Sequence, residues 1–153
     1  MNDKIAVFPG SFSPFTLGHQ YVINRAIALF DKIIIAVGSN SSKEYYFTEE
    51  QRIQWMEDIF KDEPKVEIRK YEGLTVDLCK SIGANFILRG LRNSKDFNYE
   101  KEIAQVNQTL NEEIETIFII TSSEYSHISS TLVREVARNG GDISKFVPKG
   151  IKI

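Results

Sequence analysis

The amino-acid sequence predicts an α/β domain with a doubly wound, five-stranded parallel sheet and helices on both of its faces. Five short apolar runs alternate along the chain with five segments whose apolar residues recur at helical spacing. Strands of a parallel sheet are covered on both faces, so they read as continuous apolar runs joined by right-handed helical crossovers. The 153 residues contain no linker-like stretch, internal repeat or low-complexity tract. We therefore expect a single domain over residues 1–153.

The first helix is expected between two strands, at 4–8 and 32–38. The run "KIAVF" is stopped by Pro9-Gly10, and "KIIIAVG" is β-branched throughout. From Gly18 onward, four apolar residues share one helical face: Ile23, Ala26, Ile27 and Phe30.

The second helix is expected to begin at a capping box formed by Thr48 and Gln51. Five residues make up its buried face: Ile53, Trp55, Met56, Ile59 and Phe60. A third strand follows at 65–71, and a third helix runs from Leu74 to Ile82 and ends at Gly83.

The last two strands are expected at 85–90 and 116–121. Between them lies a helix whose apolar stripe should face the core: Tyr99, Ile103, Val106 and Leu110. A final helix buries one face and stops at Asn139-Gly140-Gly141. That face consists of four residues: Leu132, Val133, Val136 and Ala137.

Polar segments follow all five expected strands. In chain order they are "PGSFSPFTLGH", "SNSSK", "EGLT", "RGLR" and "SSEYSHISST". In open parallel sheets, ligands bind beyond the carboxyl ends of the strands. We therefore expect these five segments to meet at one rim and to form a site there.

The residue types on that rim suit an anionic ligand. His19 lies at a helix start, where backbone N–H groups and the helix dipole attract anions. Arg89 directly follows an apolar strand, Arg92 comes three residues later, and Lys43 follows the second strand. The planar fork of arginine suits phosphate. Residues 128–131, "ISST", add hydroxyls at the start of the last helix.

Each of these features also has a purely structural interpretation. The first segment could be an ordinary turn with a surface histidine, and the arginines and Lys43 could be solvated charges. The "ISST" hydroxyls could serve as N-caps alone. Glu100, one position past Tyr99, could be an exposed helix charge.

Composition and missing motifs exclude several other classes of protein. The net charge of −2 gives no basic field for nucleic acid, and no leader or long apolar span points to a membrane. The single cysteine, Cys79, lies in an apolar pattern and is expected in the core of a cytoplasmic protein. The sequence has no Walker phosphate loop, G-x-G-x-x-G fingerprint, zinc-binding cluster or nucleophile elbow.

Two signatures resemble the nucleotidyltransferase superfamily. Residues 16–19, "TLGH", are similar to its T/H-x-G-H signature, and "ISSTLVRE" is similar to its second, ISST-type signature. The segments "SSKEYYFTEEQR" and "RGLRNSKDFNYE" extend the resemblance, in order, to the phosphopantetheine adenylyltransferase family over nearly the whole chain. The resemblance implies a Rossmann-like nucleotidyltransferase fold.

The resemblance also implies an activity and roles for individual residues. Enzymes of this family transfer AMP from ATP to 4′-phosphopantetheine with Mg²⁺, giving dephospho-coenzyme A and pyrophosphate in the penultimate step of coenzyme A synthesis. By resemblance, His19 stabilises the transition state, while Ser11 contacts both substrates and Phe12 the nucleotide. The residues implied to hold phosphopantetheine are Lys43, Thr75 and Arg89. The remaining residues of the implied ATP site are Gly90, Leu91, Arg92, Glu100, Tyr125, Ser126, His127, Ile128, Ser129, Ser130 and Thr131.

The family resemblance further implies a homohexamer, built as a dimer of trimers, and feedback by coenzyme A. The sequence departs from the family pattern at four positions. Ser11 replaces a common Thr, Ser13 an Asp, Leu17 an Asn and His127 an apolar residue. We expect His127 to stack or to pack in its loop rather than to act in catalysis.

Two alternative functions remain open from the sequence. One is a related nucleotidyltransferase that uses nicotinate mononucleotide or glycerol phosphate, although "RGLR" followed by "DFNYE" argues against it. The other is a nucleotide-binding sensor without catalysis, which would not need His19.

In an adenylyl transfer, the acceptor phosphate is already a nucleophile, so donors and cations suffice for catalysis.

Overall fold

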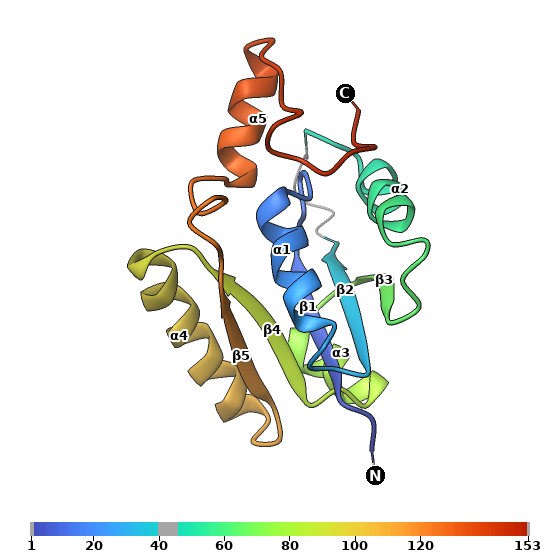
Figure 1. The fold of residues 1–153 in the computed structure, drawn as a ribbon. Helices are drawn as coiled ribbons and strands as arrows, with labels where there is room; N and C mark the ends of the chain where they lie inside the picture. Colours follow the sequence, from blue (N-terminus) through green and yellow to red (C-terminus); the bar gives the residue numbers. More distant parts are fainter. Residues whose placement is uncertain (1, 40–45, 153) are drawn as a thin grey trace.

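The computed structural model describes residues 2–39 and 46–152, and in them strands and helices alternate along the chain (Figure 1). The strands are β1 (Ile5–Gly10), β2 (Lys32–Gly38), β3 (Val66–Tyr71), β4 (Phe86–Leu91) and β5 (Glu115–Ile120). The helices are α1 (Leu17–Ala26), α2 (Glu49–Ile59), α3 (Thr75–Ile82), α4 (Ser94–Leu110) and α5 (Ser130–Arg138). The predicted alternation is confirmed.

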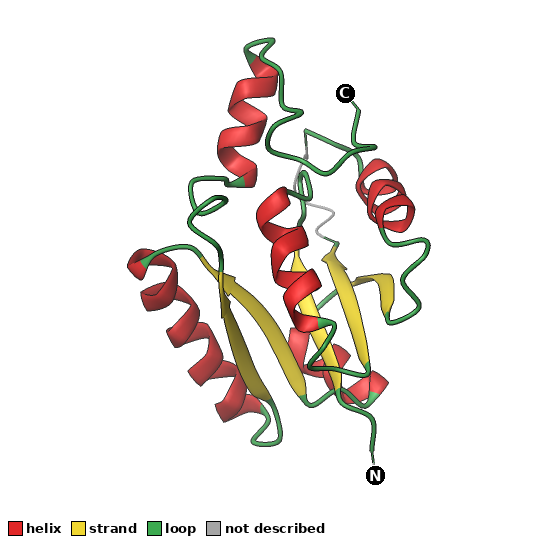
Figure 2. Cartoon of the chain, viewed as in Figure 1, coloured by secondary structure: helices red, strands yellow, loops and turns green. Residues whose placement is uncertain are grey.

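All strand pairs in the sheet are parallel, in the order β3-β2-β1-β4-β5. The order reverses direction at β1, so the sheet is doubly wound, as predicted. Residues of α1, α2 and α5 pack into one apolar cluster and residues of α3 into a second. Figure 2 shows α1 in front of the sheet and α3 behind it, so helices cover both faces.

Strand β1 continues past the expected stop. It pairs with β2 from Ile5 through Gly10, although Pro9 has no N–H to donate. Its pairing with β4 is confined to Ala6 and Val7, after which the two strands part. The carboxyl half of β1 therefore has an open side toward β4, and this opening leads into the site.

The prediction that the apolar stripe of α4 faces the core is wrong. Its four residues are exposed, from 37% at Ile103 to 65% at Tyr99, and the buried residue of this helix is Glu100. Leu132 of α5 is likewise 58% exposed, although Val133 beside it is buried. Helical periodicity identifies an apolar face, but it does not show what covers that face.

Other expectations about the core are confirmed. The capping box of Thr48 and Gln51 is present, Trp55 packs against the main apolar cluster, and Cys79 is fully buried as a free thiol. Lys43 lies outside the described residues. Within residues 2–39 and 46–152, none of the helices has both the length and the apolarity to cross a membrane.

Candidate active site

Two adjoining cavities lie at the carboxyl ends of β1 and β4. The first, of about 310 Å³, we call the histidine cavity, and the second, of about 230 Å³, the α4 cavity. Both are lined by Pro9, Gly10, Arg89 and Glu100, so they meet where β1 and β4 part. Volumes of this order suit small-molecule ligands.

Most of the predicted nucleotide residues line the histidine cavity: Ser11, Phe12, His19, Gly90, Arg92, Glu100, Ile128, Ser129, Ser130 and Thr131. Arg89, predicted to hold phosphopantetheine, lines it as well. These residues come from the ends of β1 and β4, from the starts of α1 and α5 and, for Glu100, from α4. The expected convergence of the polar segments on one rim therefore holds for these residues. Leu91, Tyr125, Ser126 and His127 do not line it, and His127 is exposed.

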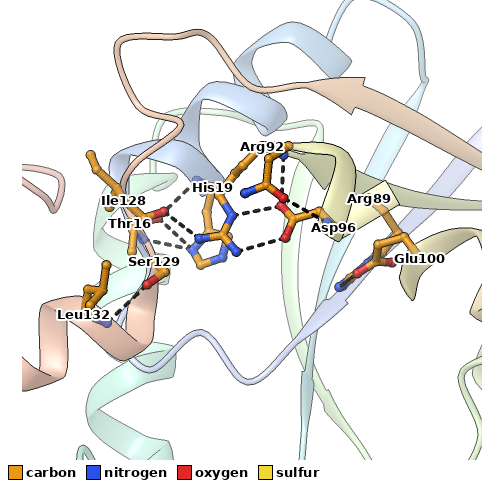
Figure 3. A network of polar contacts seen from close by, with 10 residues as sticks. Thr16, His19, Arg89, Arg92, Asp96, Glu100, Ile128, Ser129 and Leu132 are labelled. Carbon is orange, nitrogen blue, oxygen red and sulfur yellow. Dashed lines mark hydrogen bonds and ion pairs between the residues drawn. The ribbon is translucent and has the colours of Figure 1, made fainter. Parts of the chain in front are cut away.

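His19 is held by a capping box at the start of α1. Thr16 is the N-cap, and its side chain accepts a hydrogen bond from the His19 N–H at 3.3 Å. In return, the Thr16 N–H donates to Nδ1 of His19 at 3.0 Å. A histidine thus takes the place of the Glu or Gln that usually completes this motif. Figure 3 shows the imidazole beside Thr16.

The capping box also fixes the protonation state of the ring. A backbone N–H can only donate, so Nδ1 must be unprotonated, and the proton of the neutral imidazole resides on Nε2. Burial, followed by the positive charges of Arg89 and Arg92, lowers the pKa of His19 to about 3. At neutral pH the site therefore contains a neutral imidazole with one N–H donor.

Three phenylalanines surround the imidazole and limit its movement. Ring centroids of Phe12, Phe15 and Phe8 lie 5.0, 5.3 and 6.1 Å from that of His19. Phe12 is buried and adopts φ of +49°, an uncommon conformation for a residue with a side chain. Phe12 lines the histidine cavity, and its ring packs against that of His19.

Arg89, whose side chain is 28% exposed, forms an ion pair with the buried Glu100 between the two cavities. Nε and Nη2 of Arg89 donate to Oε2 and Oε1 of Glu100 at 2.8 and 2.6 Å. Nη1 donates to the carbonyl of Pro9, across the opening between β1 and β4. Glu100 is only 6% exposed, so neither residue is the solvated charge that the sequence left open.

Arg92, like Arg89, is held by a carboxylate on α4. Its Nε and Nη2 donate to the two oxygens of Asp96 at 2.9 and 3.0 Å, and its Nη1 reaches the carbonyl of Ile128 at 3.4 Å. Burial acts to raise the pKa of Asp96, but hydrogen bonds from Arg92 outweigh it and hold that pKa below its usual range. Arg92 is therefore fixed in place and links the end of β4 to the loop before α5 (Figure 3).

The "ISST" hydroxyls divide between capping and the cavity. Ser129 caps α5 by accepting from the Leu132 N–H at 3.2 Å, so the capping interpretation holds for this residue. Ser130 donates to the carbonyl of Pro14 at 2.8 Å. Thr131 is exposed at the cavity wall. The free N–H groups at this helix start add to the anion-attracting character of the cavity.

Sequence reasoning missed most of the α4 cavity. Thr75 and Arg89, both predicted to hold phosphopantetheine, line it. No site was predicted for four other lining residues: Tyr71, Tyr99, Ile103 and Asn107. The hydroxyls of Tyr71 and Thr75 lie 2.9 Å apart. Tyr99, Ile103 and Asn107 recur at four-residue spacing, so one face of α4 lines the cavity. The four-residue spacing was therefore a usable signal, but the sequence alone predicts from it a face turned to the core rather than to a cavity.

The cavities contain two carboxylates, Asp96 and Glu100, and each is already paired with an arginine. The described residues contain no group of three or more His, Cys, Asp or Glu side chains that could hold a metal ion. A cation bound here would therefore take most of its ligands from a substrate and from water, as Mg²⁺ commonly does.

Comparisons with known proteins agree with this geometry. Residues 7–136 match the family described as Cytidylyltransferase-like. Among similar proteins, "Phosphopantetheine adenylyltransferase" of Flavobacterium psychrophilum is 55% identical over 97% of both chains. The protein of the same name from Lachnoclostridium phytofermentans is 52% identical over 97% of this chain and 91% of its own.

A solved structure shares the fold. It is a bifunctional NMN adenylyltransferase/ADP ribose pyrophosphatase from Francisella tularensis, with a TM-score of 0.73 and 21% identity. The match covers 95% of this chain and 45% of that longer chain. At this identity the likeness concerns the fold alone, and it agrees with the predicted Rossmann-like architecture.

Proposed function

This chain belongs to the phosphopantetheine adenylyltransferase family and is a nucleotidyltransferase, and from this premise we propose which of its residues perform the reaction. The adenylyl group of ATP is transferred to 4′-phosphopantetheine, giving dephospho-coenzyme A and pyrophosphate in coenzyme A biosynthesis. The observation that carries the assignment of residues is the neutral His19 ring, whose proton is on Nε2, in a cavity with two anchored arginines.

In our proposal the reaction is an in-line displacement at the α-phosphorus of ATP. A phosphate oxygen of 4′-phosphopantetheine forms the new P–O bond, the bond to the bridging α–β oxygen breaks, and pyrophosphate leaves with that electron pair. No protein group needs to remove a proton, because the attacking phosphate is already anionic. The His19 Nε2–H donates to an α-phosphate oxygen as charge develops on it.

The two arginines supply fixed positive charge for this step. Arg92, held by Asp96, faces the triphosphate from the histidine cavity. Arg89 lies where the two cavities meet, and we assign it to the phosphate of 4′-phosphopantetheine. Because Glu100 and Asp96 fix the guanidinium planes beforehand, little reorganisation is needed during the reaction.

We assign ATP to the histidine cavity and the pantetheine arm to the α4 cavity. Ile103 and the Tyr99 ring offer apolar surface to the arm, and Asn107 and the hydroxyl of Thr75 offer partners for its amides. Arg89, shared by both cavities, then lies at the junction where the phosphate would meet the α-phosphorus. Lys43 and the loop residues Tyr125, Ser126 and His127 remain proposed contacts by resemblance.

We propose Mg²⁺ as the cofactor, held chiefly by phosphate oxygens and water. It would neutralise charge on the leaving pyrophosphate. Removing divalent cations with EDTA should abolish pyrophosphate release, and added Mg²⁺ should restore it. Full activity in EDTA would contradict this part of the proposal.

We propose a cytoplasmic homohexamer, a dimer of trimers. The exposed apolar row on α4 supports association, because Val106 and Leu110 are 59% and 54% exposed. Light scattering should give the mass of six chains, and Val106→Glu should shift it to a smaller species. A monomeric wild-type protein would refute the hexamer.

We propose coenzyme A as a feedback ligand, since it carries an adenine nucleotide and a pantetheine arm and so matches both assigned cavities. Inhibition should be relieved by raising 4′-phosphopantetheine. Inhibition that this substrate cannot relieve would contradict binding at the two cavities.

The decisive assay measures pyrophosphate formed from ATP with 4′-phosphopantetheine, nicotinate mononucleotide, glycerol phosphate or no acceptor. We expect release with 4′-phosphopantetheine alone. Release with another acceptor would favour a related nucleotidyltransferase, and ATP binding without release would favour a sensor. His19→Ala should lower turnover by roughly 10²–10³-fold while the fold is retained, and near-normal turnover would remove His19 from the mechanism.

A further inference from the structure

Side chains from outside the β1–α1 loop, residues 11–16, bind several of the carbonyl oxygens in and just before it. The pairs are Arg89 with Pro9, Arg52 with Ser11, Arg134 with Ser13 and Ser130 with Pro14. A carbonyl held from outside turns the N–H of the same peptide in the opposite direction. The path of the loop is thus set by donors on three other elements, β4, α2 and α5.

Arg52 is a donor with no role in the reaction as proposed. It lies on α2, is 1% exposed, and does not line either of the two cavities. Its Nη1 donates to the carbonyl of Ser11. Burying a guanidinium is costly, and an apolar side chain of similar size would pack α2 at lower cost. A charged group at this position therefore suggests a task beyond packing.

The hydrogen bond from Arg52 determines where the Phe12 N–H points. The carbonyl of Ser11 and the N–H of Phe12 belong to one peptide unit and point in opposite directions. Because the carbonyl faces the buried Arg52, the N–H faces away from α2. Ser11 and Phe12 both line the histidine cavity, so the peptide unit that joins them lies at its wall.

The conformation of Phe12 needs such support. Its φ of +49° is uncommon for a residue with a side chain and persists only where surrounding contacts impose it. Arg52 holds the peptide before Phe12, and Arg134 holds the carbonyl of Ser13 at 2.6 Å. The two arginines therefore hold the chain one peptide before Phe12 and two peptides after it.

We infer that Arg52 is a positioning residue for adenylyl transfer, which orients the Ser11–Phe12 peptide so that the Phe12 N–H donates to a phosphate of ATP. The inference rests on the proposed function, because it takes ATP as the ligand of the histidine cavity. Arg52 itself does not touch the substrate. It acts through one peptide unit, in concert with the neutral His19 donor on the same cavity wall.

The test compares Arg52→Met with Arg52→Lys and with Arg69→Met as a matched control. Arg69, on β3, hydrogen-bonds to Glu67 and does not line either cavity. Arg52→Met should lower kcat by about 10²-fold and leave the KM for 4′-phosphopantetheine within about twofold, since the α4 cavity does not contact the Ser11–Phe12 peptide. Arg52→Lys, which keeps a charged donor, should recover most of the loss. Equal kcat in Arg52→Met and Arg69→Met would overturn the inference.

A second measurement decides the inference even if Arg52→Met does not fold. In the wild-type protein with Mg²⁺, the backbone amide resonance of Phe12 should shift on titration with α,β-methylene-ATP, and in Arg52→Lys the shift should be smaller. An unmoved Phe12 amide in the wild type would refute the inference. This binding experiment needs no acceptor, so a protein that fails to use 4′-phosphopantetheine would refute the proposed function and leave this test standing.

Discussion

The low pKa of His19 makes the stability of this protein depend on pH in a predictable direction. The pKa is about 3 in the folded chain and 6.5 for an ordinary histidine. Between these values the unfolded chain binds a proton that the folded chain does not bind, so the free energy of unfolding falls as the pH falls. The contribution is fully present above 6.5 and is lost progressively as the pH falls toward 3.

The size of this loss of stability follows from the difference between the two pKa values. Each pH unit below 6.5 costs about 1.4 kcal/mol until the folded pKa is approached. Lowering the pH from about 7.5 to about 5 should therefore remove about 2 kcal/mol of stability through His19 alone. The loss arises because burial, Arg89 and Arg92 disfavour the imidazolium in the folded state.

Urea unfolding at the two pH values measures this effect. The His19→Gln variant is the control, because glutamine can complete the same capping box and does not titrate. Between the two pH values, the free energy of unfolding should fall by about 2 kcal/mol more in the wild type than in the variant. A ¹⁵N NMR titration should also show the Nε2–H tautomer down to about pH 5. Equal losses in the two proteins, or a His19 that titrates near 6.5, would refute the reasoning.

Four further variants test contacts at the site. Arg89→Ala should raise the KM for 4′-phosphopantetheine more than the KM for ATP, and equal increases would contradict the assignment of Arg89. The same variant should lose about 3 kcal/mol of unfolding free energy in urea, because Glu100 is left buried without its partner. Adding Glu100→Gln to that variant should recover part of this loss, whereas simple additivity of the two changes would argue against coupling. Gly90→Ala should destabilise the protein by about 1–3 kcal/mol, because the new Cβ would lie 2.7 Å from the stiff, buried Val22 side chain; an unchanged unfolding midpoint would show that α1 can shift. His19→Ala, unlike His19→Gln, should also lose about 0.5–1.5 kcal/mol of stability with the hydrogen bond from the Thr16 N–H, and identical midpoints for the two variants would contradict a capping role.

The sheet could be predicted from the sequence because its central strands are buried on both faces. A run such as 32–38 leaves few alternatives to a covered parallel strand. The end of β1 was placed too early, since Pro9 reads as a stop. In the structure β1 still pairs with β2 at that point, and only its pairing with β4 has ended. A sequence does not reveal on which of its two edges a strand is open.

The helix α4 shows a second limit of sequence reasoning. Its apolar residues are regularly spaced, but Tyr99 and Ile103 line a cavity while Val106 and Leu110 are exposed. The buried residue is the charged Glu100, which looked like a surface position. Only the ion pair with Arg89, eleven residues away in sequence, explains that burial. Pairings between distant elements leave no local pattern to detect.

His19 and Arg89 could both be assigned to one site from the order of strands alone, because parallel strands end at a common edge. The structure places both at the histidine cavity. Arg52 could not be found in this way. It belongs to a helix rather than to a segment that follows a strand, and its partner is a backbone carbonyl rather than a side chain.

The spacing of residues 16–19 serves folding and chemistry through the same hydrogen bonds. Three residues separate an N-cap from the position that completes a capping box, and Thr16 and His19 have this separation. Closing the box stabilises the first turn of α1 and uses the lone pair on Nδ1 of His19. The tautomer needed for donation from Nε2 is therefore selected when the helix forms, before any substrate binds. Since burial, followed by the charges of Arg89 and Arg92, lowers the pKa of His19 to about 3, the ring is a neutral donor over the whole range of neutral pH. Moving the histidine by one position along the helix would break the cap and release the tautomer together, so the spacing of this motif is constrained by the helix as well as by the reaction.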